Sequence, residues 1–171
     1  YANATDHTIK LLGRSRAIDD DTVEVMVAPF LLPREHPLAM VHGVFNAVFV
    51  TGNMLGDSMY YGRGAGKLPT ASAVVSDVID CARHQGKVIM CFWDKEEVKL
   101  ADINETERGF FIRAKAGAEG KVEAAFPGGR MVHLEDRKED FGYFTQPMKE
   151  KDFLTKYEAL GEQMLSKIRC V

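Results

Sequence analysis

A glycine-rich turn between an apolar strand and a helix is the feature that most constrains this chain. Gly62, Gly64 and Gly66 follow the apolar run at residues 59–61, and the next helix is predicted to begin at residues 69–70. Glycine lets backbone N–H groups come close to a ligand, and a helix N-terminus favours anions and polar acceptor atoms. The turn is therefore predicted to contact a nucleotide or cofactor through its backbone.

The glycine spacing matches neither of the common phosphate-binding motifs. A Walker A loop needs glycine where Tyr61 stands, and serine or threonine where Leu68 stands. A GxGxxG dinucleotide motif needs its third glycine at Lys67 or at Pro69, and no acidic ribose ligand follows at the usual distance. The spacing alone leaves two interpretations open, a tight packing corner and a ligand-binding loop.

Motifs on both sides of the turn carry a family resemblance. A run of the form HPLA…GxxNAV occupies residues 36–48, YYGRGAG occupies 60–66, and PTxxAVxxD occupies 69–77. In this order and spacing the motifs resemble the homoserine dehydrogenase family, and the resemblance is specific over residues 8–82. It favours the ligand-binding interpretation of the turn. The cofactor-binding residues that it implies are Gly62, Gly64, Ala65, Gly66 and Thr70.

The resemblance also implies an enzymatic function. Members of this family are NAD(P)-dependent oxidoreductases that interconvert L-aspartate 4-semialdehyde and L-homoserine, on the route to threonine, methionine and isoleucine. Their Rossmann domain, catalytic lysine and substrate-binding acidic residues are expected upstream of Tyr1, so no catalytic residue is predicted here. The chain lacks an initiator methionine and is interpreted as an inactive C-terminal portion of such an enzyme. The alternative is a non-catalytic module for amino-acid sensing or dimerisation.

The first half of the chain predicts an antiparallel sheet. Strands are predicted at residues 8–18 and 22–32 around an aspartate turn at 19–21, and the alternating valines of the second strand predict an apolar face. Residues 46–51 are apolar on both faces and predict a central strand covered on both sides, followed by a returning strand at 57–62. One face of this strand is expected to be covered by another subunit or by the missing domain. The chain is therefore expected to form a homo-oligomer, and the family resemblance implies a dimer.

The rest of the chain predicts a helix, a connection and a second domain. A helix at residues 69–85 stops at Gly86, and residues 87–108 are predicted to connect two domains. The later elements are predicted as a strand at 110–116, a helix at 121–126, strands at 131–134 and 141–145 around a polar hairpin tip at 136–140, a helix at 149–163, and a strand at 164–171. This βαββαβ order resembles an ACT domain, a ferredoxin-like regulatory module. The predicted fold is α+β, mostly antiparallel sheet with helices, with a catalytic part at 1–86 and an ACT-like domain at 109–171.

The ligand loop of the ACT-like domain departs from the usual pattern. The usual DxPG sequence is replaced by residues 117–122, and Pro127 ends the following helix early. The resemblance implies an amino-acid effector, with threonine as the first candidate. The departure predicts that any such binding is weak, since loop backbone and a helix start would hold the charged groups of the effector.

Composition argues against several kinds of partner and site. The net charge of −3 argues against a nucleic-acid partner, and no apolar run reaches the roughly 20 residues that span a membrane. Cys81, Cys91 and Cys170 lack metal-binding spacing and are predicted to be small buried residues in a reducing cytoplasm. The histidines form no cluster, so no metal site is predicted, and His36 is expected to cap or orient its loop.

Overall fold

The computed structural model describes the whole chain apart from residues 88–91 and 93–94. The described residues form two compact units. The first, here called the sheet unit, combines Tyr1–Arg34 with Val98–Val171, and the second, the hairpin unit, is Glu35–Glu97. Each unit is described by itself.

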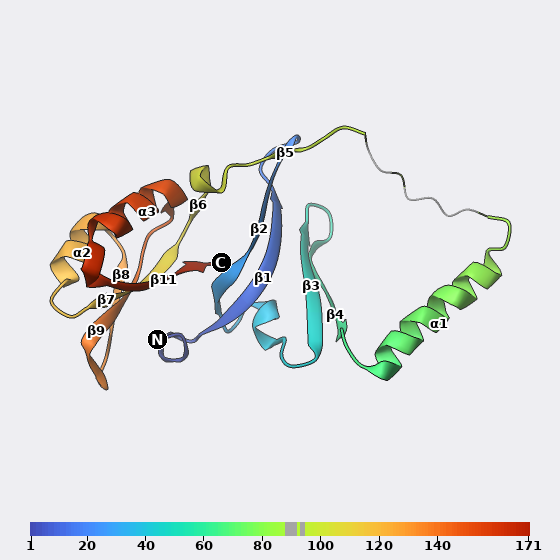
Figure 1. Cartoon of the computed structure of the whole chain (residues 1–171), viewed down its shortest axis with the longest axis horizontal. Helices are drawn as coiled ribbons and strands as arrows, with labels where there is room; N and C mark the ends of the chain where they lie inside the picture. Colours follow the sequence, from blue (N-terminus) through green and yellow to red (C-terminus); the bar gives the residue numbers. More distant parts are fainter. Residues whose placement is uncertain (88–91, 93–94) are drawn as a thin grey trace. The chain divides into compact units, whose positions relative to one another are not determined.

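One continuous, mostly antiparallel sheet forms the basis of the sheet unit (Figure 1). In spatial order its strands are β1 (His7–Ala17), β2 (Thr22–Pro33), β11 (Met164–Cys170), β7 (Phe110–Lys115), β9 (Arg137–Phe144) and β8 (Arg130–Leu134), with β5 (Lys99–Leu100) paired to β2. β1 and β2 form the predicted hairpin around the aspartate turn. β11 runs parallel to β2 and pairs with it at Arg169 and Cys170, and this pairing merges the two predicted sheets into one.

The later part of the sheet unit has ferredoxin-like topology. Helices α2 (Glu119–Ala125) and α3 (Glu150–Ala159) lie together on one face of β7, β8, β9 and β11 (Figure 1). Phe110 of β7 stacks on Phe153 of α3 with ring centroids 3.6 Å apart, and Ile112 and Ala114 continue the same buried face of β7. Burial of a large apolar side chain stabilises a fold by about 1.5–3 kcal/mol. The predicted α+β fold, with a βαββαβ second part, is confirmed.

The predicted polar hairpin tip at residues 136–140 is largely wrong. The turn lies at Glu135 and Asp136, β9 already begins at Arg137, and Asp140 is buried inside that strand at 2% exposure. The Arg137 guanidinium donates two hydrogen bonds to the Asp140 carboxylate, at 3.1 Å each. A carboxylate can be buried when charged partners of this kind replace water. The charged residues at 136–140 are therefore not all part of a solvated turn.

The buried face of β2 is not the face that carries the valines. The side chains at Glu24, Met26 and Ala28 are buried, whereas Val25 and Val27 on the other face are 44% and 76% exposed. Glu24 can be buried because Arg108 pairs with it. The valine face is apolar, as predicted, but the described residues leave it uncovered.

The hairpin unit consists of a two-stranded hairpin and one helix. β3 (Phe45–Gly52) pairs in antiparallel register with β4 (Gly56–Arg63), and α1 (Lys67–Arg83) follows. Within the described chain, β3 pairs at residues 46–51 with β4 alone and Val48 is 62% exposed, so the expected cover by another subunit or domain stays a prediction. Apolar residues predict burial, but burial needs a covering surface that the described residues do not supply. No residue of α1 is buried either.

Short elements complete the described fold. They are the 3₁₀ turns η1 (Asn3–Thr5), η2 (Pro37–Met40), η3 (Ile103–Glu105) and η4 (Gly161–Gln163), and the strands β6 (Glu107–Arg108) and β10 (Met148–Lys149), which pair with each other. The predicted connection at 87–108 therefore contains β5, η3 and β6. The proposed boundaries of a catalytic and an ACT-like domain stay a prediction, and the compact units divide the chain at other positions.

Candidate functional site

The glycine-rich turn connects β4 to the first turn of α1. The Gly64 N–H donates to the Val44 carbonyl at 3.1 Å, which fixes the turn to the start of β3. Gly66 precedes the helix with φ of 122° and ψ of 152°, a combination open almost only to glycine. Its carbonyl accepts the Thr70 N–H at 3.1 Å. Glycine at position 66 is therefore required by the backbone path of the turn.

Gly64 is needed for a different reason, which is space. A Cβ atom at this position would overlap the side-chain amide of Asn46, whose Cγ would lie 2.7 Å away. Asn46 stands opposite Gly62 in the β3–β4 register. The Asn46 amide thus lies over the turn and presents a donor and an acceptor beside the backbone of Gly64. In the sequence, Asn46 is only one residue of the GxxNAV motif. Its position beside the turn depends on the register of β3 and β4.

Unpaired donors and positive charge meet at this turn. The first N–H groups of a helix have no acceptor within it, and no side chain caps α1, so the N–H groups of Lys67 and Leu68 face outward from its first turn. Pro69 has no N–H group to satisfy. The Arg63 guanidinium lies 5.3 Å from the centre of the Phe45 ring, at the end of β4. Backbone donors flanked by Arg63 and Lys67 suit an anionic group or an amide carbonyl.

The five predicted cofactor-binding residues occupy three different positions. Gly64, Ala65 and Gly66 form the exposed turn itself. Gly62 lies within β4, and Thr70 lies one helical turn into α1. Their roles as cofactor contacts stay a prediction, and the geometry singles out the turn and the helix start as the part with free hydrogen-bonding capacity.

Metal-binding and nucleophilic chemistry find no support among the described residues. In that part of the chain no group of three His, Cys, Asp or Glu residues is placed to hold a metal ion. His36 Nδ1 accepts the Leu38 N–H at 3.2 Å, which confirms the predicted capping role.

The prediction of buried cysteines is wrong for Cys81, which is exposed on α1. Partial burial raises the pKa of the Cys170 thiol to about 11. Cys91 lies outside the described residues.

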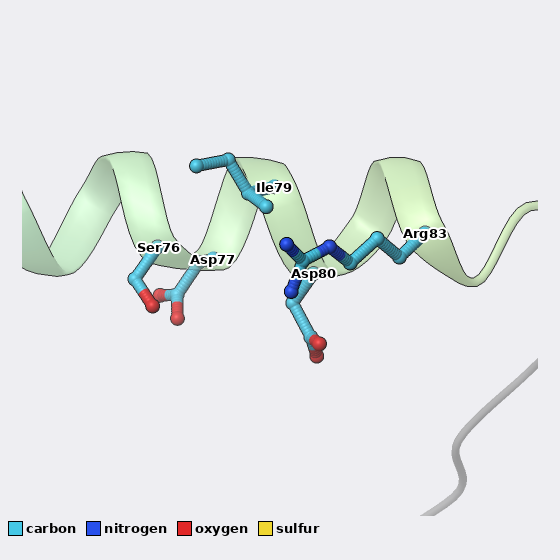
Figure 2. Close-up of a pocket in the computed structure, with 5 residues that line it drawn as sticks. All are labelled: Ser76, Asp77, Ile79, Asp80 and Arg83. Atoms are coloured by element: carbon cyan, nitrogen blue, oxygen red, sulfur yellow. The ribbon is translucent and has the colours of Figure 1, made fainter.

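A shallow depression lies along α1 itself. Figure 2 shows the five side chains that line it, and all of them come from this one helix. They are Ser76, Asp77, Ile79, Asp80 and Arg83. Every one of them is exposed, so the depression does not enclose a ligand or exclude water from a reacting group. It is a surface feature of an uncovered helix.

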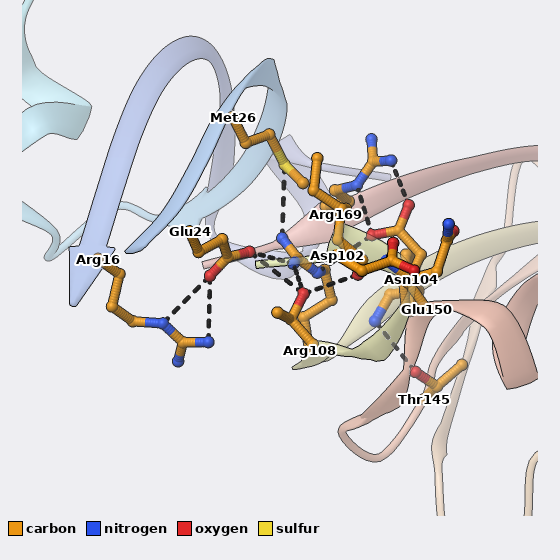
Figure 3. Close-up of polar contacts among 12 residues, drawn as sticks. Arg16, Glu24, Met26, Asp102, Asn104, Arg108, Thr145, Glu150 and Arg169 are labelled. Atoms are coloured by element: carbon orange, nitrogen blue, oxygen red, sulfur yellow. Dashed lines mark hydrogen bonds and ion pairs between the residues drawn. The ribbon is translucent and has the colours of Figure 1, made fainter. Parts of the chain in front are cut away.

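Three buried charges lie in the middle of an ion ladder in the sheet unit (Figure 3). The ladder alternates Arg16, Glu24, Arg108, Glu150 and Arg169, and so ties together β1, β2, β6, α3 and β11. The side chains of the three middle members are at most 4% exposed. Arg108 Nε lies 3.2 Å from Glu150 and the other end of the guanidinium pairs with Glu24, so Arg108 links both glutamates.

The electrostatics around Glu24 favour its ionised form. Burial acts to raise the pKa of Glu24, but the hydrogen bond and charge of Arg108, with Arg16 beside it, outweigh burial and leave the pKa below its ordinary value. The Thr106 hydroxyl also donates to Glu24, at 3.3 Å. Since its partners hold Glu24 ionised, it does not act as a proton donor at neutral pH, and we assign the ladder a structural role. It fixes the later part of the sheet unit to β1 and β2.

Comparison with known proteins places this geometry in a family. Residues 1–79, which include the whole turn and most of α1, match the family model for homoserine dehydrogenase. The chain is similar to the C-terminal portion of homoserine dehydrogenases. The homoserine dehydrogenase of Mycobacterium bovis is 36% identical over an alignment of 151 residues that covers 81% of this chain and 34% of that enzyme. That of Neisseria gonorrhoeae is 52% identical over 83 residues, or 48% of this chain and 19% of the enzyme.

Solved structures of homoserine dehydrogenases share the fold over the full chain. The enzyme from Thiobacillus denitrificans matches with a TM-score of 0.80 and 25% identity, covering 100% of this chain and 44% of that one. A Staphylococcus aureus homoserine dehydrogenase matches with a TM-score of 0.69 over 99% of this chain and 43% of that one. This chain thus spans less than half the length of each homoserine dehydrogenase compared here. None of its described helices is long and apolar enough to cross a membrane.

Proposed function

We propose that this chain is part of an NAD(P)-dependent homoserine dehydrogenase, in which the turn at Gly64, Ala65 and Gly66 contacts the cofactor. The observation that carries the proposal is the coincidence of the family match with a turn that offers unpaired backbone donors. The enzyme would interconvert L-aspartate 4-semialdehyde and L-homoserine in the cytoplasm, on the route to threonine and methionine. The cofactor supplies the hydride chemistry when it is bound.

The residues of this chain at the turn would bind and orient the cofactor, and they would not transfer protons. The outward N–H groups of Lys67 and Leu68 would hold an acceptor group of the cofactor, and the Asn46 amide would limit where that group can lie. Gly62 and Thr70 would support the turn from either side. The described residues offer no paired acid and base at the turn, so proton transfer is assigned to residues outside this chain.

The activity assay that tests this proposal compares two proteins. The 171-residue chain alone is expected to give no homoserine-dependent reduction of NAD or NADP. A longer protein that carries this chain behind a dinucleotide-binding domain is expected to do so. Turnover by the isolated chain would show that its own residues complete the catalytic site. Absence of turnover in the longer protein, with both cofactors tried, would favour the alternative of a non-catalytic module.

Self-association as a homodimer is part of the proposal. Leu11, Val25 and Val27 present an exposed apolar face on β1 and β2. Leu11 and Val27 are 72% and 76% exposed, and apolar faces of this kind commonly mark interfaces. A second subunit or another domain of the same enzyme would cover this face.

Threonine is expected to bind the later part of the sheet unit weakly, if it binds there at all. α2 is only seven residues long, Ala118 offers no side-chain cap at its start, and Glu119 places a negative charge in its first turn. A carboxylate effector would be repelled there by Glu119. Calorimetry of the chain with threonine is expected to give no tight, saturable heat. A dissociation constant of about 10 µM or lower, roughly −7 kcal/mol, would contradict this expectation.

A further inference from the structure

A groove of about 480 Å³ opens on the face of the sheet opposite α2 and α3. The groove exists because β2 and β11 are joined only near Arg169 and Cys170, so the two strands part on the side of Ser166. Phe111 and Arg113 alternate with the core residues of β7, which places their side chains on this helix-free face. Ser166 and Ile168 of β11 stand directly opposite them and share it.

The walls of the groove are mainly apolar. Ile9 of β1 and its partner Leu31 of β2 form one side, and Phe111 and Ile168 form the other. The N-terminal segment of residues 1–3 crosses this face, where the Tyr1 ring packs against Phe111 with centroids 5.7 Å apart. An aliphatic group placed between these walls would be removed from water on several sides, which favours binding in proportion to the apolar area covered.

One wall of the groove carries the Arg113 guanidinium, which lies beside the buried Asp140 carboxylate. The Asp140 carboxylate receives two hydrogen bonds from Arg137 at 3.1 Å and one from the Tyr1 hydroxyl at 2.8 Å. Arg113 Nε also lies 2.7 Å from Asp140, while Arg137 has Glu139 as a second partner at 3.7 Å. Arg113 makes no other ion pair or hydrogen bond with the described residues, and its side chain is 38% exposed. Its terminal nitrogens are available to an anion.

We propose that this groove binds a small apolar carboxylate. The Arg113 guanidinium holds the carboxylate group, and the aliphatic tail lies between Leu31 and Ile168. The terminal nitrogens of Arg113 have no acceptor among the described residues, and guanidinium–carboxylate pairs are among the stronger hydrogen-bonded contacts. The site lies in the sheet unit, so it does not depend on the function proposed for the glycine-rich turn.

Calorimetry of the 171-residue chain with hexanoate tests the proposal, with hexanamide as the neutral probe of the same shape. Hexanoate is expected to bind saturably and hexanamide at least about tenfold more weakly, because the amide lacks the charge that Arg113 pairs with. In Arg113→Met the affinity for hexanoate is expected to fall by about tenfold or more. The fold should survive this change, since Asp140 keeps Arg137 and Tyr1 as partners.

Arg130→Met is the matched control. Arg130 is a cation on the same helix-free face, where it lies 4.4 Å from the centre of the Phe144 ring, but it does not line the groove. This variant is expected to bind hexanoate within about twofold of the unaltered chain, as surface charges outside a contact contribute little. The proposal is overturned by absence of saturable hexanoate binding, by equal binding of hexanamide, or by equal losses in Arg113→Met and Arg130→Met.

Discussion

Arg108→Met is expected to lower the free energy of unfolding of the sheet unit by about 3 kcal/mol. Methionine fills much of the space of the arginine side chain but leaves Glu24 and Glu150 buried without their shared partner. Each glutamate keeps one arginine, Arg16 or Arg169, which holds the loss at the low end for a broken buried ion pair. Urea unfolding at neutral pH, followed by circular dichroism, measures the change.

Arg16→Met provides the matched control for this prediction. Arg16 makes its ion pair with Glu24 from the exposed end of the ladder, at 3.1 Å and with 43% of its side chain exposed. Its loss is expected to cost less than about 1 kcal/mol, because water screens and replaces an exposed partner. Equal losses in the two variants would mean that the ladder does not stabilise the sheet unit through its buried members.

The effect of Arg108→Met is also expected to depend on pH. The pKa of Glu24 in the folded chain lies below its ordinary value of 4.5, since Arg108 and Arg16 outweigh the burial that would raise it. Its ionised form therefore contributes stability that is fully present above pH 4.5 and is lost as the pH falls through the folded pKa. The difference in the free energy of unfolding between the unaltered chain and Arg108→Met should therefore become smaller as the pH falls through the folded pKa of Glu24.

Local sequence patterns predicted the individual elements well because those patterns report local geometry. Phe110, Ile112 and Ala114 alternate with period two, and the structure buries all three on one face of β7. The hairpin around residues 19–21 and the βαββαβ order follow from turn residues and periodicity in the same way. None of these features needs knowledge of residues far along the chain.

Buried charges could not be predicted in that way. Glu24 and Arg108 lie 84 positions apart, and the same residue types on a solvated surface would produce the same local sequence. Asp140 was assigned to a polar tip for this reason, although it lies within β9 beside Arg137 and Arg113. Burial of a charge is decided by its partners, and the partners are set by the pairing of distant strands.

The candidate site was predicted in part, and the missing part has a similar cause. The glycine pattern identified the turn, while its assignment to a cofactor came from the family resemblance and not from spacing. The Asn46 amide over Gly64 follows from the β3–β4 register, which places residue 46 opposite residue 62. Register is fixed by the whole hairpin, so no single motif indicates this contact.

In an enzyme that carries this chain, Gly66→Ala is expected to lower kcat/KM for the cofactor by about a hundredfold, the usual scale for misplacing a binding group by about 1 Å. This prediction rests on the proposed function. Alanine is strained at φ of 122° and ψ of 152°, so the backbone must rotate at the start of α1. That rotation turns the N–H groups of Lys67 and Leu68 away from the position where they would meet the cofactor.

Gly56→Ala separates this effect from a simple loss of stability. Gly56 also has positive φ, at 74°, and it is the first residue of β4, paired with Gly52 at the end of the hairpin, where an added Cβ would meet no atom within 4 Å. Both alanines therefore carry a similar backbone strain, of about 1–3 kcal/mol, but only position 66 precedes the free helix start. Gly56→Ala is expected to keep kcat/KM within about twofold, since strain confined to the end of the hairpin leaves the binding groups in place. If the two variants lose kcat/KM equally, the glycine-rich turn is a packing corner, and cofactor binding must be assigned elsewhere in the enzyme.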